Sequence, residues 1–233
     1  MSLYTDASDP PVTLDRRDGP HGEVVLRRRG DRHEIIANGC FLMDTSDGRS
    51  ERLLVDAAYD ALAAAGKRDP ALLIGGLGVG FSLAHAAANP NWRSIAVVER
   101  EQAIIDWHRT GPLRQISGDA LADPRSVILH TDLLDHLRAG PDHAERYDAL
   151  CLDIDNGPDW TVTDDNGNLY SPAGLAACQA LLEPGGILAV WSAQPSAAFE
   201  DALRNAGFTG VRTEEIPLAR GVPDVVHLAV RPA

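Results

Sequence analysis

The sequence predicts an α/β fold in which a mostly parallel sheet is covered by helices on both faces. From residue 71 onward, short apolar runs alternate with segments of helical periodicity, and several of the runs end at a glycine or an acidic residue. The balance of 44% hydrophobic and 24% charged residues is that of a folded globular chain. Ligands of such sheets bind beyond the carboxyl ends of the strands, so functional residues are expected there.

A small N-terminal β region, residues 1–46, is expected to precede a larger domain, residues 47–233. The dipeptide Gly30-Asp31 is typical of a hairpin turn. The three arginines before it, Arg27–Arg29, are interpreted as a solvated strand edge, and a phosphate-binding role stays open. The short strands expected in this region are Val24–Leu26, Glu34–Ile36 and Phe41–Met43.

The larger domain begins with an amphipathic helix and continues as alternating strands and helices. Strands buried on both faces of a parallel sheet have continuous apolar sequences, and such runs recur here. The expected helices are 50–65, 80–88, 102–109, 172–182 and 195–206, and the expected strands are 71–74, 94–98, 126–130, 148–152 and 187–191, with more strand-forming sequence at 209–231.

A glycine-rich turn follows the first of these strands. Glycines let the backbone approach a ligand closely, and the helix behind the turn offers free N–H groups. Phe81 stands where the dinucleotide fingerprint GxGxxG needs its third glycine, so that fingerprint is not met. Such a turn can also serve only to pack helix on strand. The candidate cofactor-binding glycines are Gly75, Gly76, Gly78 and Gly80.

Acidic residues follow the other strands. Glu99 ends the second strand, where a carboxylate can accept both hydroxyls of a ribose. Asp132 follows the third strand and is either an acceptor for an adenine amine or the N-cap of a following helix. Asp153 and Asp155 follow the fourth strand. Carboxylates held close together there can bind a cationic amine or sulfonium, or take a proton from a nucleophile.

The composition limits the partners and the compartment. The formal charge of −13 disfavours nucleic acid as a partner. No apolar stretch approaches the roughly 18 residues of a membrane-spanning helix, and the polar N-terminus is unlike a secretory signal. Three scattered cysteines without a CxxC pair predict a reduced, cytoplasmic protein, and histidines without HxH or HExxH spacing predict no metal site.

Taken in order, five segments resemble the spermidine synthase-like branch of the Rossmann-type, class I S-adenosylmethionine-dependent methyltransferase superfamily. The resemblance covers roughly residues 20–230 and implies a Rossmann-like methyltransferase fold with a mostly parallel seven-stranded sheet and a small N-terminal β-hairpin region. The segments are LLIGGLGVG, the Val-Val-Glu end of the second strand, DPRSVILHTDLLDHL, YDALCLDIDNGP and LYSPAGLAACQALLEPGGILAVWS.

The resemblance implies a sulfonium nucleoside, either S-adenosylmethionine or decarboxylated S-adenosylmethionine, and a small-molecule acceptor such as an amine. The glycine turn would lie against the methionine-derived part of the nucleoside, Glu99 would hold the ribose and Asp132 the adenine, with Leu133 as a further cofactor-binding residue. Asp153 would orient and deprotonate an attacking amine, with Asp155 beside it as a second candidate catalytic residue.

The chain departs from the polyamine synthases of this group at three places. Those enzymes usually carry GGGDGG at the turn, and Gly78 stands where their aspartate holds the ammonium of the decarboxylated donor. An acid there would repel a carboxylate, so Gly78 favours intact S-adenosylmethionine and methyl transfer over aminopropyl transfer. Leu54-Val55-Asp56 replaces Tyr-His-Glu, and residues 153–157 replace DSSDP, so groups used for diamines are changed.

Two interpretations of other kinds stay open. A non-catalytic nucleoside-binding protein on the same scaffold would also lack substrate residues. A nicotinamide-dependent dehydrogenase fits the alternating pattern and Glu99, but the third glycine is missing. The sequence does not fix the acceptor or the oligomeric state, although the N-terminal strands could extend a sheet between the two chains of a homodimer.

Overall fold

The computed structural model describes residues 10–140, 145–154, 156–159, 164–216 and 222–233. The chain divides into two compact units, Met1–Asp47 and Gly48–Ala233. Asp155, one of the two predicted catalytic residues, lies outside the described residues. None of the helices in the described part of the chain is long and apolar enough to span a membrane.

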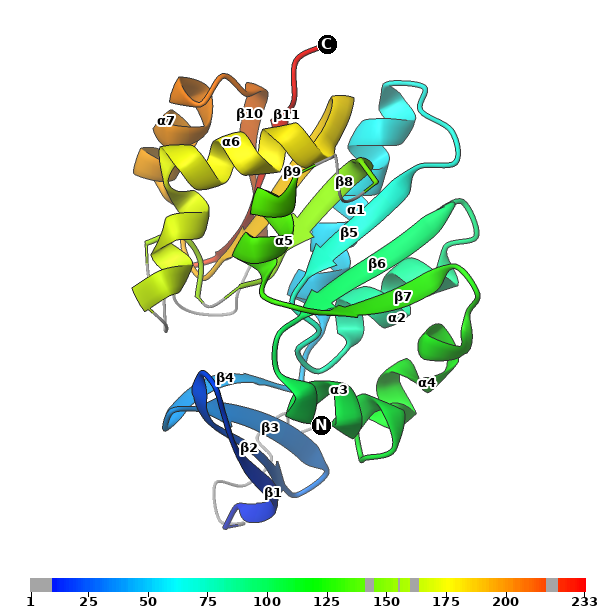
Figure 1. The fold of residues 1–233 in the computed structure, drawn as a ribbon, viewed down its shortest axis with the longest axis vertical. Helices are drawn as coiled ribbons and strands as arrows, with labels where there is room; N and C mark the ends of the chain where they lie inside the picture. Colours follow the sequence, from blue (N-terminus) through cyan, green and yellow to red (C-terminus); the bar gives the residue numbers. More distant parts are fainter. Residues whose placement is uncertain (1–9, 141–144, 155, 160–163, 217–221) are drawn as a thin grey trace. The chain divides into compact units, whose positions relative to one another are not determined.

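The first unit is an antiparallel sheet in the order β1–β2–β3–β4 (Figure 1). The predicted turn is confirmed, since Gly30-Asp31 joins β2 to β3, with a φ of 57° at Gly30. The sheet is larger than a hairpin because the polar sequence 12–19 forms an exposed edge strand that shows little apolar alternation. The strands are β1 (Val12–Gly19), β2 (Gly22–Arg29), β3 (Arg32–Ala37) and β4 (Cys40–Asp44).

Two of the three arginines before the turn are paired within this sheet. The side chain of Arg27 donates a hydrogen bond to Glu34, and Arg29 Nε donates to Glu34 Oε1 at 3.0 Å. Glu34 lies on the neighbouring strand β3, directly opposite Arg27. Part of the positive charge of this segment is therefore balanced inside the unit.

The second unit contains a seven-stranded sheet in the order β10–β11–β9–β8–β5–β6–β7. Strands β5 to β9 run parallel, whereas β11 is antiparallel to β9 and to β10. This mostly parallel sheet confirms the predicted fold class. The strands are β5 (Ala71–Gly75), β6 (Ser94–Glu99), β7 (Ser126–His130), β8 (Tyr147–Leu152), β9 (Leu182–Ser192), β10 (Thr209–Ile216) and β11 (Asp224–Val230).

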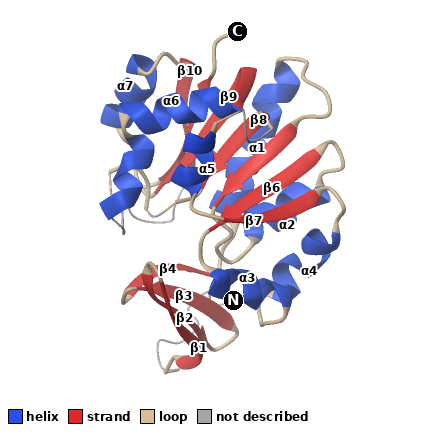
Figure 2. Cartoon of the chain, in the orientation of Figure 1, coloured by secondary structure: helices blue, strands red, loops and turns tan. Residues whose placement is uncertain are grey.

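Helices cover both faces of this sheet (Figures 1 and 2). Helices α1 (Arg49–Ala64), α2 (Phe81–Ala88) and α4 (Arg114–Ala122) cover one face, and α3 (Gln102–Arg109) packs on α4. The other face is covered by α5 (Leu133–Ala139), α6 (Pro172–Leu181) and α7 (Ala197–Asn205), with the 3₁₀ helix η1 (Asp164–Tyr170) beside α5 and α6.

The apolar strand sequences fill the space between these two helical layers. β5 and β8 are buried along their whole lengths. Successive residues face opposite layers, so Leu150 and Leu152 join the cluster under α5, α6 and α7, while Cys151 Sγ lies 3.6 Å from the carbonyl oxygen of Leu54 in α1. Each fully buried leucine contributes about 1.5–3 kcal/mol, so the continuous apolar runs stabilise the sheet from both sides.

The structure differs from the sequence expectation in several elements. Helix α4 was not expected, and α5 was expected only in the alternative that makes Asp132 an N-cap. α4 carries Gly118 in its interior, which weakens the helical signal, and α5 has only seven residues. β9 begins at Leu182 rather than Ile187. Its first residues pair with the chain end, since Gly185 N donates to Arg231 O at 3.0 Å and Arg231 N donates to Gly186 O at 2.8 Å.

The strand order places a topological switch point at β5. This strand lies between β6 and β8, so the chain leaves β5 toward one side and later returns along the other. Ligands of open α/β sheets bind at the carboxyl edge of such a point. The glycine turn after β5 and Asp153 after β8 therefore meet at this edge.

Candidate functional site

The glycine turn lies directly against the backbone that follows β8. Gly76 has a φ of 92°, and a Cβ built on it would lie 2.7 Å from the carbonyl oxygen of Asp153. Asp153 N in turn donates to Gly75 O at 3.1 Å, which continues the ladder between β5 and β8 beyond the last residue of β8. Glycine at position 76 is therefore required by a close backbone approach as well as by its left-handed conformation.

Two of the other glycines also have packing reasons. A Cβ on Gly75 would lie 2.8 Å from Leu133 Cδ2 and 2.9 Å from Leu152 Cδ2. Gly80 has a φ of 94° at the start of α2, and its Cβ would lie 2.8 Å from His108 Cε1. Gly78 has a φ of 49°. The turn is thus shaped by its neighbours in the fold, and contact of these glycines with a nucleoside stays a prediction.

Glu99 is joined to the glycine turn by a hydrogen bond. Its carboxylate accepts from the backbone N–H of Leu77 at 3.0 Å and from the N–H of Glu101 at 2.7 Å. Burial raises the pKa of Glu99, and the two backbone donors oppose that effect. The expectation that the turn and the end of β6 lie together is confirmed. Each carboxylate oxygen keeps acceptor capacity, so binding of ribose hydroxyls remains chemically feasible.

Asp132 is the N-cap of α5. Its Oδ1 accepts from Leu134 N at 2.8 Å and from Asp135 N at 3.3 Å, while Oδ2 lies 3.9 Å from Arg100 Nη1. Of the two alternatives for Asp132, the capping role is therefore observed. Leu133 is buried and packs against Gly75. The adenine role of Asp132, which would fall to Oδ2, and the contact of Leu133 with the cofactor stay predictions.

Asp153 lies among carboxylates at the carboxyl end of β8. The pKa of Asp153 is raised to about 7, first by burial and then by the negative charges of Glu51 and Asp224. Glu51 belongs to the first turn of α1, and Asp224 begins β11, where its Oδ2 accepts from Ser50 Oγ at 3.0 Å. Two acidic side chains, one from α1 and one from β11, thus act on Asp153 at the end of β8.

Sequence reasoning identified Asp153 but missed Glu51 and Asp224. Neither lies at the carboxyl end of a parallel strand, and the two are far apart in the sequence. The only sequence signal for Glu51 was an acid in the first turn of a helix, a position that acidic residues commonly occupy to complement the helix dipole. Their proximity to Asp153 is visible only once the sheet is assembled.

Residues 54–56, which replace the family's Tyr-His-Glu motif, offer no polar side chain to a ligand in the way that motif does: two of them are apolar and buried, and the third pairs with a histidine. Leu54 and Val55 are buried in the core. Asp56 Oδ1 lies 2.7 Å from His85 Nε2 in α2. Across the described ranges of the chain, no group of three or more His, Cys, Asp or Glu side chains is arranged to hold a metal ion.

Comparison with known proteins gives relatives of one kind. The chain is 28% identical over 190 residues to the polyamine aminopropyltransferase of Mycobacterium tuberculosis (strain H37Rv), covering 81% of this chain and 34% of the relative. It is 30% identical over 184 residues to the polyamine aminopropyltransferase of Corynebacterium efficiens, covering 79% of this chain and 33% of the relative. The chain therefore spans about a third of the length of these curated relatives. No protein-family model matches the chain.

Two solved structures share the fold. Spermidine synthase from Thermotoga maritima superposes with a TM-score of 0.72 at 16% identity, over 94% of this chain and 73% of that one. A spermidine synthase in complex with the transition state analogue AdoDATO gives a TM-score of 0.73 at 15% identity, over 94% and 72%. The chain thus has the spermidine synthase fold and is related in sequence to polyamine aminopropyltransferases, which confirms its resemblance to the spermidine synthase-like branch of the class I methyltransferase superfamily.

Proposed function

We propose that this chain binds a sulfonium nucleoside at the carboxyl edge of β5, β6, β7 and β8, and transfers an aminopropyl group from it to an amine. One observation carries the proposal. The glycine turn is hydrogen-bonded to Glu99 through Leu77 N, and the same turn lies against the backbone of Asp153. A predicted ribose acceptor and a predicted base are thereby held on either side of one glycine turn.

The residues fit such a nucleoside. Glu99 supplies a buried carboxylate that accepts a hydrogen bond from Leu77 N in the glycine turn. When bound, the sulfonium supplies the carbon that is transferred and departs as a neutral thioether. Asp153 and its neighbours would hold the attacking amine and take its proton. With a pKa of about 7, the Asp153 carboxyl exchanges a proton near neutral pH, which suits that task.

The charge around Asp153 supports a cationic ligand. Glu51 and Asp224 add negative charge to that of Asp153, and a bound ammonium would relieve the mutual repulsion of these groups. Because Gly76 packs on Asp153, the same charge acts on the methionine-derived part of a nucleoside in the turn. It would repel a carboxylate there and attract an ammonium. The names of the relatives support aminopropyl transfer as well.

Methyl transfer from intact S-adenosylmethionine is the second candidate, and Gly78 is the observation that favours it. The relatives do not support this reaction, but the turn lacks the aspartate that would hold the donor's ammonium. The two candidates therefore differ in the charge that the site prefers at the end of the donor side chain.

Titration calorimetry with each donor tests the proposal, followed by mass spectrometry of products formed from 1,4-diaminobutane and other amines. We expect the decarboxylated donor to bind more tightly and the amine to gain an aminopropyl group. A methylated product from S-adenosylmethionine would establish the second candidate instead. Binding without turnover would indicate a nucleoside-binding protein, and binding of neither donor would overturn both reactions.

The variant Gly78→Asp sharpens this experiment. The φ of 49° at Gly78 lies in the left-handed region that aspartate tolerates better than most residues. The added carboxylate should strengthen binding of the decarboxylated donor and weaken binding of S-adenosylmethionine by about tenfold each. Equal effects on both donors would show that the turn does not face the end of the donor side chain.

A further inference from the structure

His108 in α3 is fully buried, and both of its ring nitrogens have partners. Nε2 lies 2.9 Å from the carbonyl oxygen of Gly78 in the glycine turn, and Nδ1 lies 2.6 Å from Ser117 Oγ in α4. Ser117 is fully buried as well. A chain of two hydrogen bonds therefore runs from α4 through α3 to the turn.

The acceptor at Gly78 determines the state of the ring. A carbonyl oxygen can only accept, so Nε2 must carry the hydrogen. Burial lowers the pKa of His108, while contacts with the carbonyls of Gly78 and Leu113 oppose that effect, and the net shift favours the neutral ring. Nδ1 then has a free lone pair, and Ser117 Oγ–H donates to it.

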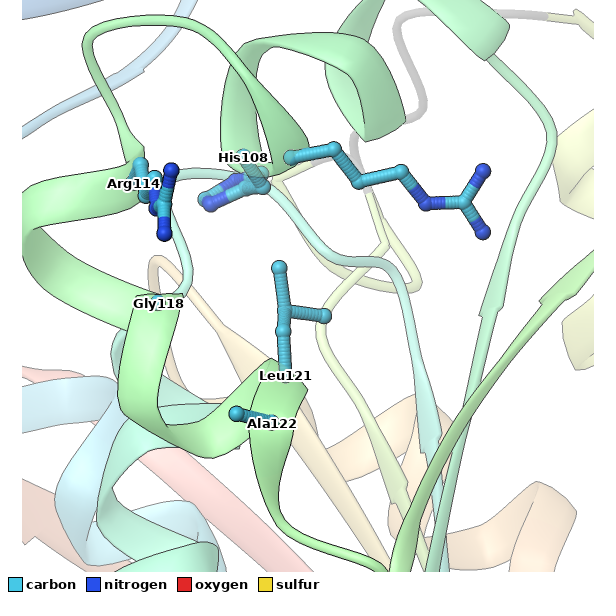
Figure 3. A pocket seen from close by; sticks show the side chains of 6 residues that line it. His108, Arg114, Gly118, Leu121 and Ala122 are labelled. Carbon is cyan, nitrogen blue, oxygen red and sulfur yellow. The ribbon is translucent and has the colours of Figure 1, made fainter.

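The turn is also packed against this pair. A Cβ on Gly80 would lie 2.8 Å from His108 Cε1 and 3.1 Å from Ser117 Cβ. His108 lines, with Arg114 and Gly118 of α4, a depression of about 240 Å³. Figure 3 shows how these residues lie around it. His108 thus contacts the turn through a hydrogen bond at Gly78 and through van der Waals packing at Gly80.

We propose that His108 is a positioning residue that fixes the Gly78–Val79 peptide of the glycine turn, with Ser117 holding the ring in place through Nδ1. The inference rests on the proposed function, because the turn is where the donor nucleoside is expected to bind. The donor end of the site would then depend on a residue of α3 that itself touches no ligand.

Two amide variants separate the hydrogen bond from the packing. In His108→Gln the amide nitrogen reaches the place of Nε2 and can still donate to Gly78 O, whereas in His108→Asn the amide reaches only the place of Nδ1. Both variants are neutral and polar. We expect His108→Asn to weaken donor binding about tenfold, and His108→Gln to bind within about threefold of the wild type.

The control is His227→Phe. His227 is also fully buried and also has a hydroxyl partner, since its Nδ1 lies 2.8 Å from Thr213 Oγ1, but it belongs to β11, which β9 and β8 separate from β5. This variant should lower the melting temperature without changing donor affinity. Calorimetry with S-adenosylmethionine and its decarboxylated form, and thermal unfolding, would be measured for every variant.

The tautomer is measured on the wild-type protein, by long-range ¹H–¹⁵N correlation of the histidine rings. We expect His108 to have hydrogen on Nε2 only, and Ser117→Ala to keep this tautomer because the Gly78 carbonyl oxygen remains its acceptor. A ring with hydrogen on Nδ1, or equal donor affinity in the wild type and His108→Asn, would overturn the inference while leaving the proposed function standing. Failure of the wild type to bind either donor would overturn both.

Discussion

At the scale of single residues, the unusual feature is a carboxyl group whose ionisation is opposed by its surroundings. Asp153 has a pKa of about 7 against an ordinary value of 3.8. The folded protein therefore holds a proton that the unfolded chain releases between about pH 4 and pH 7. The stabilisation from this proton is complete below about pH 4 and is lost as the pH rises through 7.

We therefore expect Asp153→Asn to stabilise the protein at alkaline pH. The pKa difference corresponds to roughly 4 kcal/mol at most, and about 2 kcal/mol is expected at about pH 8 because the residue is only half-buried. At about pH 4 the gain should vanish. Denaturant unfolding at both pH values measures this, with the exposed Asp201→Asn as the control. An equal effect of Asp153→Asn at both pH values would contradict the raised pKa.

Sequence reasoning identified site residues when they directly follow an apolar run that predicts a strand. Glu99 and Asp153 follow apolar runs directly, so their position at the sheet edge could be predicted. His108 follows no such run. In the sequence of an amphipathic helix, a buried histidine that positions a neighbouring segment looks the same as one that only fills space. Its role depends on the distance from α3 to the turn, which only the tertiary structure sets.

At the scale of elements, α5 depends on the residue that caps it. Asp132 satisfies two of the free N–H groups of a helix only seven residues long. Asp132→Ala should therefore cost about 1 kcal/mol of stability, and Asp132→Ser should restore most of it.

The same two variants test the nucleoside role of Asp132. A serine hydroxyl can cap the helix, but it does not replace the second carboxylate oxygen. If Oδ2 also accepts the adenine amine, Asp132→Ser will fold normally and still bind the donor several-fold more weakly. Thermal unfolding and calorimetry on one sample separate the two effects. Wild-type affinity in Asp132→Ser would assign Asp132 to capping alone.

Strands were predicted correctly where burial on both faces requires a continuous apolar sequence. β5, β6 and β8 lie inside the sheet and matched expectation within a residue or two. β1 and the first residues of β9 did not, because one is an exposed polar edge and the other contains Pro184 and two glycines. Pairing with the end of the chain holds the start of β9 in the sheet in spite of these residues.

At the scale of the whole molecule, the acidic charge acts on any charged ligand. A formal charge of −13 attracts a cationic acceptor over distances comparable with the Debye length. We expect the dissociation constant of 1,4-diaminobutane to rise several-fold as NaCl increases from about 0.05 M to about 0.5 M. The uncharged 5′-methylthioadenosine is the control, and its affinity should stay nearly constant. An equal change in both dissociation constants would mean that salt perturbs the fold rather than screening the electrostatic attraction.

The division of labour between elements has a consequence for how this scaffold can diversify. Glu51 and Asp224 approach Asp153 from α1 and from β11, whereas the glycine turn and Glu99 belong to the central strands β5 and β6. Substitutions in these peripheral segments can therefore change the charge offered to the acceptor while the glycine turn and Glu99 are inherited unchanged. A directed-evolution library confined to α1 and the start of β11 would explore new acceptors and leave the glycine turn and Glu99 intact.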